Sequence, residues 1–203
     1  MKGSIRTPFS VYIEVIKMYI NSQVFTKHPE TTATQKEMDS YLFLESNGVE
    51  YIRAEHDEAA TIELCEEIEK VIDAKICKNL LLCNRQQTKF YMLLIPGDMV
   101  FKTKYLSAQI NSARLSFAGG DKMEELLNVT PGSLTVLSLM YDKNKEVELL
   151  IEKNVFKEKY FGCHPCVNSA TVRFLTADLK EKVLPALERE YTVVDLECPE
   201  DEA

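Results

Sequence analysis

Two apolar runs near the middle of the chain constrain its fold more than any other feature. Residues 79–83 (NLLLC) and 90–95 (FYMLLI) are separated by the polar stretch NRQQTK. Two short apolar runs joined by a polar connection of this kind predict a β-hairpin. The sequence Pro96-Gly97-Asp98 follows, and we expect it to end the second strand.

Weaker patterns predict the remaining elements. Thr34 and Glu37 have the spacing of a capping box, and the helix that they begin is expected to stop at Asn47-Gly48. Residues 134–140 and 147–151 are expected to form a second hairpin across the turn DKNK. Further strands are expected at residues 50–54, 160–163, 171–175 and 191–196, and further helices at residues 62–72, 105–112, 122–127 and 178–190. Strand pairs mixed with helices indicate an α+β domain around one mostly antiparallel or mixed sheet.

The length of 203 residues suits one domain with an attached segment. We expect residues 1–33 to form an extension, with a helix over Phe9–Asn21 and a linker over residues 26–33. Residues 34–196 would then form the folded domain, and residues 197–203 a short acidic tail. Within the last predicted helix, Pro185 predicts a kink or an earlier end.

Composition points to the cytoplasm. Apolar residues make up 45% of the chain and charged residues 28%, which is typical of a globular protein. Six cysteines in a chain of this length suggest reduced thiols more than a disulfide framework. The longest apolar run, Phe9–Ile20, carries Glu14 and Lys17, so neither a membrane span nor a signal peptide is expected.

The net charge of −8 is unevenly distributed. Ten acids and two bases lie between Glu45 and Asp73, whereas seven bases and one acid lie between Lys75 and Phe117. An anion-binding face on an otherwise acidic protein is compatible with this pattern, as are solvated lysines scattered over several faces. A protein that holds long duplex should be basic overall, but one that touches only the end of a nucleic acid need not be.

Several common sites are missing from the sequence. It has no glycine-rich dinucleotide or P-loop motif, and its three histidines form no recognisable nucleophilic triad. Cys163-His-Pro-Cys166 is a C-x-x-C motif, but zinc would need a second ligand pair, and a redox site would need the motif to open a helix. We therefore expect no metal and no organic cofactor, and chemistry based on positioning and polarisation.

Three motifs carry a specific resemblance. The first is Lys78-Asn79-Leu-Leu-Leu followed by the run from Phe90 to Asp98, and the second is Pro131-Gly-Ser-Leu-Thr135. The third is Gly162-Cys-His-Pro165 with Asn168-Ser-Ala-Thr171. In this order they resemble the YbaK/ProX family, stand-alone relatives of the editing domain of bacterial prolyl-tRNA synthetase, over roughly residues 34–196.

The resemblance implies a function and a partner. The His-Pro…Asn-x-x-Thr element is typical of the ProX branch. This implies trans-editing, in which the ester bond between a mischarged alanine and proline tRNA is hydrolysed. It also implies a compact body built on a curved sheet, the acceptor end of tRNA as substrate, and a possible association with prolyl-tRNA synthetase. Both a monomer and a homodimer are compatible with it. In the family, the ribose hydroxyl of the substrate is thought to help activate water.

The same resemblance assigns site residues. An aminoacyl ester is already activated, so a deacylase chiefly orients water and stabilises charge on the carbonyl oxygen. We assign Lys78 as the catalytic cation. The substrate-binding residues are expected to be Asn79, Gly132, Ser133, Thr135, Gly162, His164 and Asn168. His56, in the acidic segment, is expected to lie at the surface.

One departure from the family keeps alternatives open. The family's substrate loop commonly runs Gly-x-x-x-Pro, and here the fifth position is Val136. The loss of proline can change the width of the pocket and hence which small amino acid it accepts. Two alternatives remain: a catalytically silent module that binds aminoacyl-tRNA or an amino acid, and a cysteinyl-tRNA(Pro) deacylase.

Overall fold

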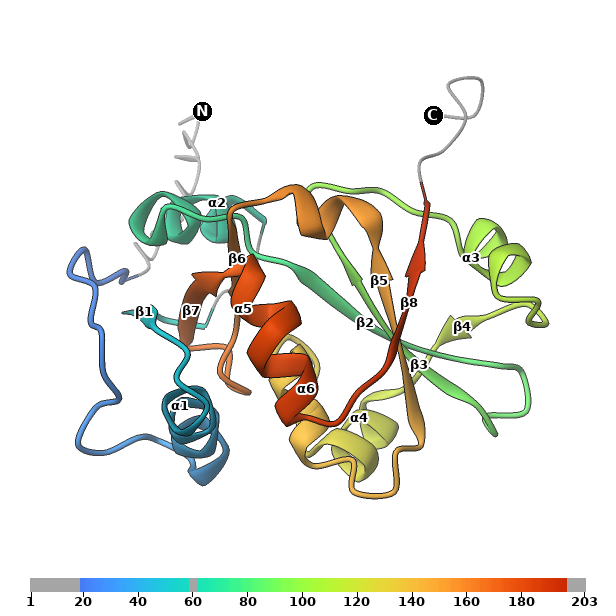
Figure 1. Cartoon of the computed structure of the whole chain (residues 1–203), viewed down its shortest axis with the longest axis horizontal. Helices are drawn as coiled ribbons and strands as arrows, with labels where there is room; N and C mark the ends of the chain where they lie inside the picture. Colours follow the sequence, from blue (N-terminus) through green and yellow to red (C-terminus); the bar gives the residue numbers. More distant parts are fainter. Residues whose placement is uncertain (1–18, 59–61, 197–203) are drawn as a thin grey trace, which may run out of the picture.

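The computed structural model describes residues 19–58 and 62–196 (Figure 1). Among these residues no helix is long and apolar enough to cross a membrane. In chain order the elements are α1 (Gln35–Ser46), β1 (Tyr51–Glu55), α2 (Ile62–Ile72), β2 (Lys78–Cys83), β3 (Phe90–Ile95), α3 (Thr103–Gln109), β4 (Ser116–Phe117), α4 (Gly120–Leu127), η1 (Val136–Met140), β5 (Val147–Glu152), η2 (Lys153–Lys157), β6 (Tyr160–Cys163), β7 (Ala170–Leu175), α5 (Thr176–Asp178), η3 (Leu179–Val183), α6 (Leu184–Ala186) and β8 (Tyr191–Val194).

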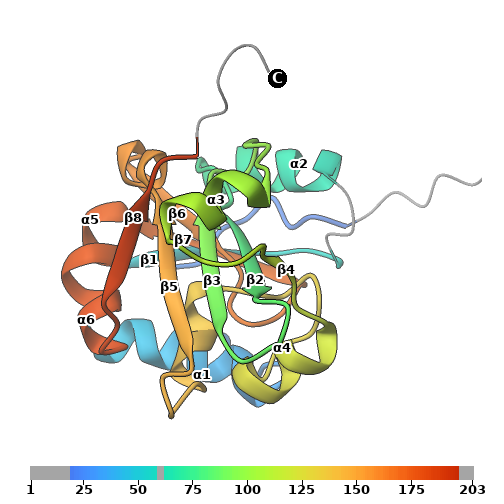
Figure 2. The ribbon, with the colours of Figure 1, turned by 90° about the vertical axis from the view of Figure 1, so that its right-hand side faces the viewer.

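A five-stranded mixed sheet forms the larger part of the molecule, in the order β4-β2-β3-β5-β8. Its strands lie side by side in Figure 2. The predicted hairpin is confirmed, because β2 and β3 pair antiparallel from Lys78 opposite Ile95 to Cys83 opposite Phe90. Every residue of β3 is buried, as expected for a central strand covered on both faces. The predicted α+β class is thus confirmed, but the strands form two sheets where the sequence predicted one.

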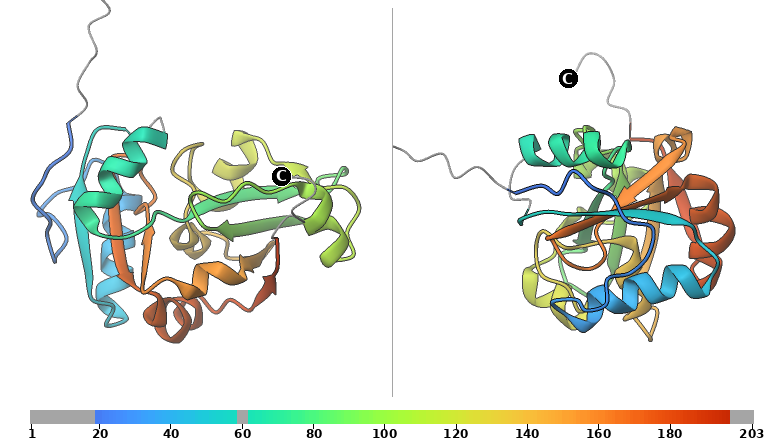
Figure 3. Two further views of the ribbon diagram at one scale, coloured as in Figure 1. Left: turned by 90° about the horizontal axis from the view of Figure 1, so that it is seen from above. Right: turned by 90° about the vertical axis from the view of Figure 1, so that its left-hand side faces the viewer.

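A second, three-stranded antiparallel sheet has the order β1-β7-β6. The amide of Gly162 in β6 donates to the carbonyl of Lys75 at 3.2 Å, and the amide of Cys77 donates to the carbonyl of Gly162 at 2.8 Å. Residues 75–77 therefore join the small sheet to β2 of the large one. Seen from above, the sheets lie at the two ends of the molecule, and the chain passes from α2 to β2 between them (Figure 3).

The predicted second hairpin is wrong. Residues 136–140 form the 3-10 helix η1, and β5 pairs in parallel with β3 and β8. Local hydrogen bonds favour the helix: the Thr135 hydroxyl accepts from the amide of Leu137 at 3.4 Å, and the Ser138 hydroxyl donates to the carbonyl of Thr135 at 2.6 Å. A buried apolar run has the same composition in a strand and in a buried helix, so the pattern could not separate them.

The N-terminal part of the described chain packs against the small sheet. Isolated bridges join Ile20 to His56 and Phe25 to Arg53, so this part extends β1 on its outer side. The guanidinium of Arg53 lies 4.4 Å from the centre of the Phe25 ring. The helix expected over residues 9–21 lies largely outside the described residues, and its described end, residues 19–21, is not helical.

Both ends of the first predicted helix are confirmed. Thr34 is the N-cap of α1, and its side chain accepts from the amide of Glu37, while Gly48 follows the helix with φ +64°. The last predicted helix ends early, at Ala186, shortly after Pro185. A π-helical turn, η3, precedes this proline, which has no amide hydrogen to donate.

Candidate active site

A cavity of about 440 Å³ lies between the two sheets. Its wall includes Cys65, Glu66 and Glu69 of α2, residues 75–80 at the start of β2, the turn residues Gly97 and Asp98, Met123 of α4, the loop residues Pro131, Gly132 and Leu134, and His164 after β6. The structure therefore brings together Lys78, Asn79, Gly132 and His164, which come from three separate motifs of the sequence.

The backbone before Lys78 is held from several sides. A Cβ atom on Gly162 would lie 2.6 Å from the carbonyl oxygen of Lys75, and one on Gly97 would lie 2.4 Å from that of Ile76. Only glycine permits this approach of two backbones. The Glu69 carboxylate also accepts from the amide of Ile76 at 2.9 Å. These contacts fix the direction in which β2 begins and so the place of Lys78.

Lys78 and Asn79 present polar groups at the entrance to β2. The Lys78 ammonium donates to the carbonyl of Met99 at 3.5 Å and is half-buried. Burial raises the pKa of the neighbouring Cys65 thiol, as does Glu69, while the positive charge of Lys78 lowers it. The side-chain amide of Asn79 donates to the carbonyl of Cys77 at 3.0 Å. Its buried Oδ1 accepts no hydrogen bond from the part of the chain that the structure describes.

The loop at Gly132 forms one lip of the cavity. Gly132 has φ +90°, and a Cβ atom there would lie 3.1 Å from the side-chain nitrogen of Asn168. The Ser133 hydroxyl donates to the carbonyl of Thr130 at 2.8 Å and accepts from the amide of Thr130 at 3.2 Å. Ser133 thus tightens the loop, while the backbone of Gly132 is exposed at the cavity.

Hydrogen bonds to backbone and side chain fix the ring of His164. Its Nδ1 lies 3.0 Å from the carbonyl oxygen of Ala170 and 3.2 Å from the hydroxyl of Thr171. Because a carbonyl only accepts, Nδ1 carries the proton in the neutral ring, and Nε2 has a lone pair. Burial, together with a smaller effect of nearby His56, lowers the pKa of His164 to about 4, so the ring is neutral at pH 7.

His56 is linked to His164 through the hydroxyl of Thr171. The expectation that His56 lies at the surface is wrong. It is 5% exposed, and its Nδ1 donates to the carbonyl of Asp57 at 2.7 Å. Its Nε2 therefore accepts from the Thr171 hydroxyl at 2.9 Å, which in turn accepts from His164. Burial also lowers the pKa of His56. The contact joins residues 115 positions apart, so no local pattern could have revealed it.

Acidic side chains of α2 form another part of the cavity wall. The Glu69 carboxylate lies 3.2 Å from the Lys75 ammonium, and its side chain is only 15% exposed. Glu66 and Asp98 also line the cavity. In the sequence, the two glutamates stand out only as members of a charged segment. The amphipathic spacing of α2 was visible, but its packing against the start of β2 was not.

The other predicted site residues lie behind the cavity wall. Thr135 is fully buried and caps η1. Gly162 forms hydrogen bonds with residues 75–77, and we call this junction the seam between the sheets. Asn168 lies against Gly132. Cys163 and Cys166 are buried free thiols, and burial raises the pKa of each to about 12. A thiol with so high a pKa is a poor nucleophile and a poor metal ligand at neutral pH.

Comparison with known proteins identifies the family to which this chain belongs. The sequence profile of the aminoacyl-tRNA editing domain matches residues 56–182. The chain belongs to this family, the YbaK/ProX family of aminoacyl-tRNA editing deacylases.

Two relatives of known name are similar to this chain over most of its length. The chain is 31% identical over 153 residues to the prolyl-tRNA editing protein ProX of Acetoanaerobium sticklandii, covering 75% of this chain and 93% of that protein. It is 26% identical over 147 residues to prolyl-tRNA synthetase associated domain-containing protein 1 of Danio rerio, covering 71% and 78% of the two chains.

A solved structure supports the fold. A protein assigned provisionally as a trans-editing enzyme for prolyl-tRNA synthetase superposes with a TM-score of 0.61. The match covers 83% of this chain and all of that one at 14% sequence identity. At so low an identity the likeness concerns the fold alone.

Proposed function

We propose that the protein is a trans-editing deacylase that hydrolyses the ester bond of alanyl-tRNA(Pro). The observation that carries this proposal is the convergence of Lys78, Asn79, Gly132 and His164 on one cavity. A cavity of about 440 Å³ lies in the size range of small-ligand sites. It can take an aminoacyl group together with part of the terminal nucleoside.

In this proposal the reaction is addition of water to the ester carbonyl. The tetrahedral intermediate carries a negative charge on the former carbonyl oxygen, which the Lys78 ammonium stabilises. The attacking water gives its proton to the lone pair of His164 Nε2 or to the neighbouring ribose hydroxyl. The His164 imidazolium returns this proton to the departing ribose oxygen, or the ribose hydroxyl passes on its own proton instead, and the products are free alanine and deacylated tRNA.

The walls of the cavity suit an aminoacyl ester. The α-ammonium group of the substrate is positive, and the acidic residues Glu66, Glu69 and Asp98 are part of the lining. Leu80, Met123 and Leu134 supply apolar surface for a small alkyl side chain. Val136, which stands in place of the family's proline, is fully buried in η1 and is not part of the lining.

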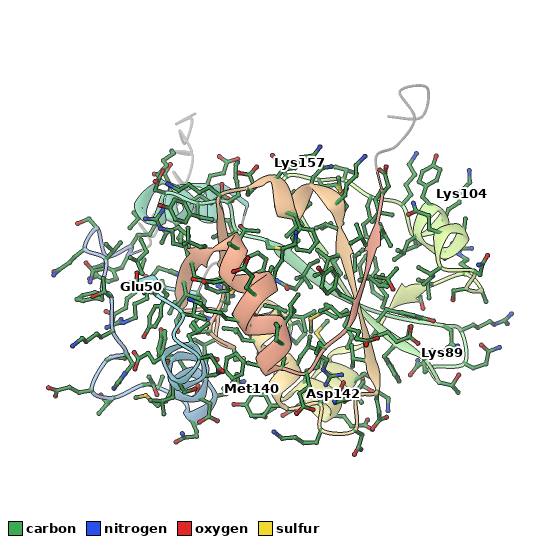
Figure 4. The ribbon with its side chains drawn as sticks, viewed as in Figure 1. Glu50, Lys89, Lys104, Met140, Asp142 and Lys157 are labelled. Carbon is green, nitrogen blue, oxygen red and sulfur yellow. The ribbon has the colours of Figure 1, made fainter. Side chains whose placement is uncertain are left out.

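The test is hydrolysis of purified alanyl-tRNA(Pro), prolyl-tRNA(Pro) and cysteinyl-tRNA(Pro). We expect release of alanine alone, and we expect Lys78→Ala to reduce its rate by about 10²–10³-fold at an unchanged melting temperature. Lys89→Ala is the matched control, because Lys89 is exposed at the far end of the same hairpin (Figure 4).

Other outcomes would change the proposal in defined ways. Release of cysteine alone would keep the chemistry but replace the substrate. Binding of the esters without turnover would indicate the silent binding module. Equal rates for Lys78→Ala and wild type would remove Lys78 from the mechanism.

A further inference from the structure

A groove of about 730 Å³ lies beside α3, outside the cavity. Lys102, Lys104 and Arg114 bring positive charge to it, and Phe101 and Phe117 supply aromatic surface. No acidic residue occurs among the described residues that line it. We call this surface the basic groove.

The cationic side chains of the groove and Phe117 are exposed. Phe117 is 61% exposed, and its ring meets that of Phe101 edge to face with centroids 6.4 Å apart. Lys102, Lys104 and Arg114 are also exposed, and Figure 4 shows Lys104 pointing away from the body of the molecule. Positive charge combined with open aromatic rings is the usual composition of a site for single-stranded nucleic acid, in which phosphates meet the cations and bases stack on the rings.

The basic groove and the cavity are connected along one surface segment. Gly97 and Asp98 line the cavity, the Lys78 ammonium donates to the carbonyl of Met99, and Phe101 lines the groove. Between them Val100 is 81% exposed. A ligand that leaves the cavity past Lys78 can therefore reach the groove along residues 97–101.

The distance fits the end of a tRNA. Phe117 pairs with Leu82, which is four residues beyond Lys78 on β2. At about 3.3 Å per residue the separation along the strand is about 13 Å. At about 3.4 Å per stacked nucleotide this corresponds to about four nucleotides, the length of the unpaired 3′ end of tRNA.

We propose that the basic groove binds the unpaired 3′ end of tRNA where it joins the acceptor stem, while the terminal aminoacyl group occupies the cavity. Lys102, Lys104 and Arg114 contact phosphates, and Phe117 stacks on a base. The proposal rests on the proposed function for the orientation of the RNA, since the cavity must hold its 3′ end.

The test measures binding separately from catalysis. The probe is a fluorescein-labelled, non-acylated minihelix with the acceptor stem and CCA end of tRNA(Pro), and the readout is fluorescence anisotropy over a range of salt concentrations. We expect Lys102→Ala/Lys104→Ala to raise Kd about tenfold and to lower the slope of log Kd against log salt by about 0.7–0.9 per lysine. Phe117→Leu, which keeps an apolar contact with Phe101, should raise Kd about fivefold through loss of stacking.

The matched control removes the same charge elsewhere. Lys143→Ala/Lys180→Ala changes two exposed lysines outside the groove, and Figure 4 places Asp142, the neighbour of Lys143, near the lower edge of the molecule and Lys104 at its upper right. We expect its Kd and salt dependence to equal those of wild type. An equal loss in both double variants would overturn the proposal, as would equal affinity for a blunt duplex without the 3′ end.

A second readout separates this proposal from the proposed function. For alanyl-minihelix, the Lys102→Ala/Lys104→Ala variant should raise KM more than it lowers kcat, and the change should be much smaller for 3′-alanyl-adenosine, which has no stem. If no ester is hydrolysed, the deacylase fails while the anisotropy result still decides the groove. If both esters are hydrolysed equally well by variant and wild type, the groove fails while the deacylase stands.

Discussion

The cavity and the basic groove lie at the two ends of residues 97–101. Their positively charged side chains differ in burial and in how the backbone positions them. Lys78 is half-buried, and backbone contacts at Gly97 and Gly162 determine where its strand begins. Lys104 is exposed on the short helix α3. The difference matches the role that we propose for each charge, because stabilisation of a developing charge depends on exact distance, whereas attraction of a polyanion depends mainly on the sum of charges.

This comparison predicts that changes in the supports of the cavity alter turnover even of a substrate without a stem. Changes in the groove should act mainly through affinity for RNA. For hydrolysis of 3′-alanyl-adenosine, we expect the largest loss of turnover from a change at Gly162 and a smaller loss from a change at Thr171. The smallest change in turnover is expected from mild acid.

The largest effect is expected for Gly162→Ala. The new methyl group would lie 2.6 Å from the carbonyl oxygen of Lys75, so the backbone before Lys78 must move. We expect a loss of about 2–4 kcal/mol in the free energy of unfolding and at least about a 100-fold loss in kcat. Chemical denaturation and ester hydrolysis measure the two effects.

Gly119→Ala provides the control for that experiment. Its new methyl group would meet the side chain of Asp121, which can turn away. We expect both stability and turnover close to wild type. If Gly162→Ala behaved in the same way, the seam between the sheets would not determine the place of Lys78.

A smaller effect is expected for Thr171→Val. The variant keeps the shape but removes the hydroxyl that joins His56 to His164. His164 keeps the carbonyl of Ala170 as a partner, so we expect about a tenfold loss in kcat and a destabilisation of about 1–3 kcal/mol from the unsatisfied His56. Thr171→Ser should restore both. A merely structural role would change stability without changing the pH profile of kcat, so that profile is measured for all three proteins.

The smallest effect is expected from mild acid. The pKa of His164 is lowered to about 4 in the folded state, whereas an unfolded histidine titrates near 6.5. Between these values the unfolded chain binds the extra proton, so stability falls as pH falls, by up to about 1.4 kcal/mol per pH unit for this residue. Turnover should change by less than about twofold between pH 8 and 6, because the ring stays neutral.

His164→Gln isolates this contribution. Denaturation curves of wild type and variant between pH 7 and 4 should differ in their slope against pH, with the shallower slope for the variant. Identical slopes would show that the folded protein binds the proton at His164 as readily as the unfolded chain does.

Sequence patterns predicted the elements whose signals are local. The helix N-cap at Thr34 and the hairpin of β2 and β3 depend on residues close together in the chain, and both are confirmed. The strand expected at residues 134–140 was wrong because the hydrogen bonds of Thr135 and Ser138 decide between two structures with the same apolar pattern. The parallel pairing of β5 with β3 and β8 could not be predicted either, because these partner strands are distant from β5 in the sequence.

The same distinction between local and long-range signals applies to the candidate site. Family motifs marked Lys78, Asn79, Gly132 and His164, which line the cavity together. They could not distinguish these from Thr135 and Gly162, which support the wall from behind. Nor could they reveal His56, which reaches Thr171 only in the folded chain.

The seam between the two sheets has a consequence for synthesis on the ribosome. Lys78 emerges early, but Gly162 and His164 follow only when most of the chain has been translated. A nascent chain that has folded only its central hairpin lacks the part of the wall that His164 supplies, so its cavity is incomplete. Under the proposed function, the growing chain therefore becomes competent for editing only after β6 and the residues that follow it have been translated.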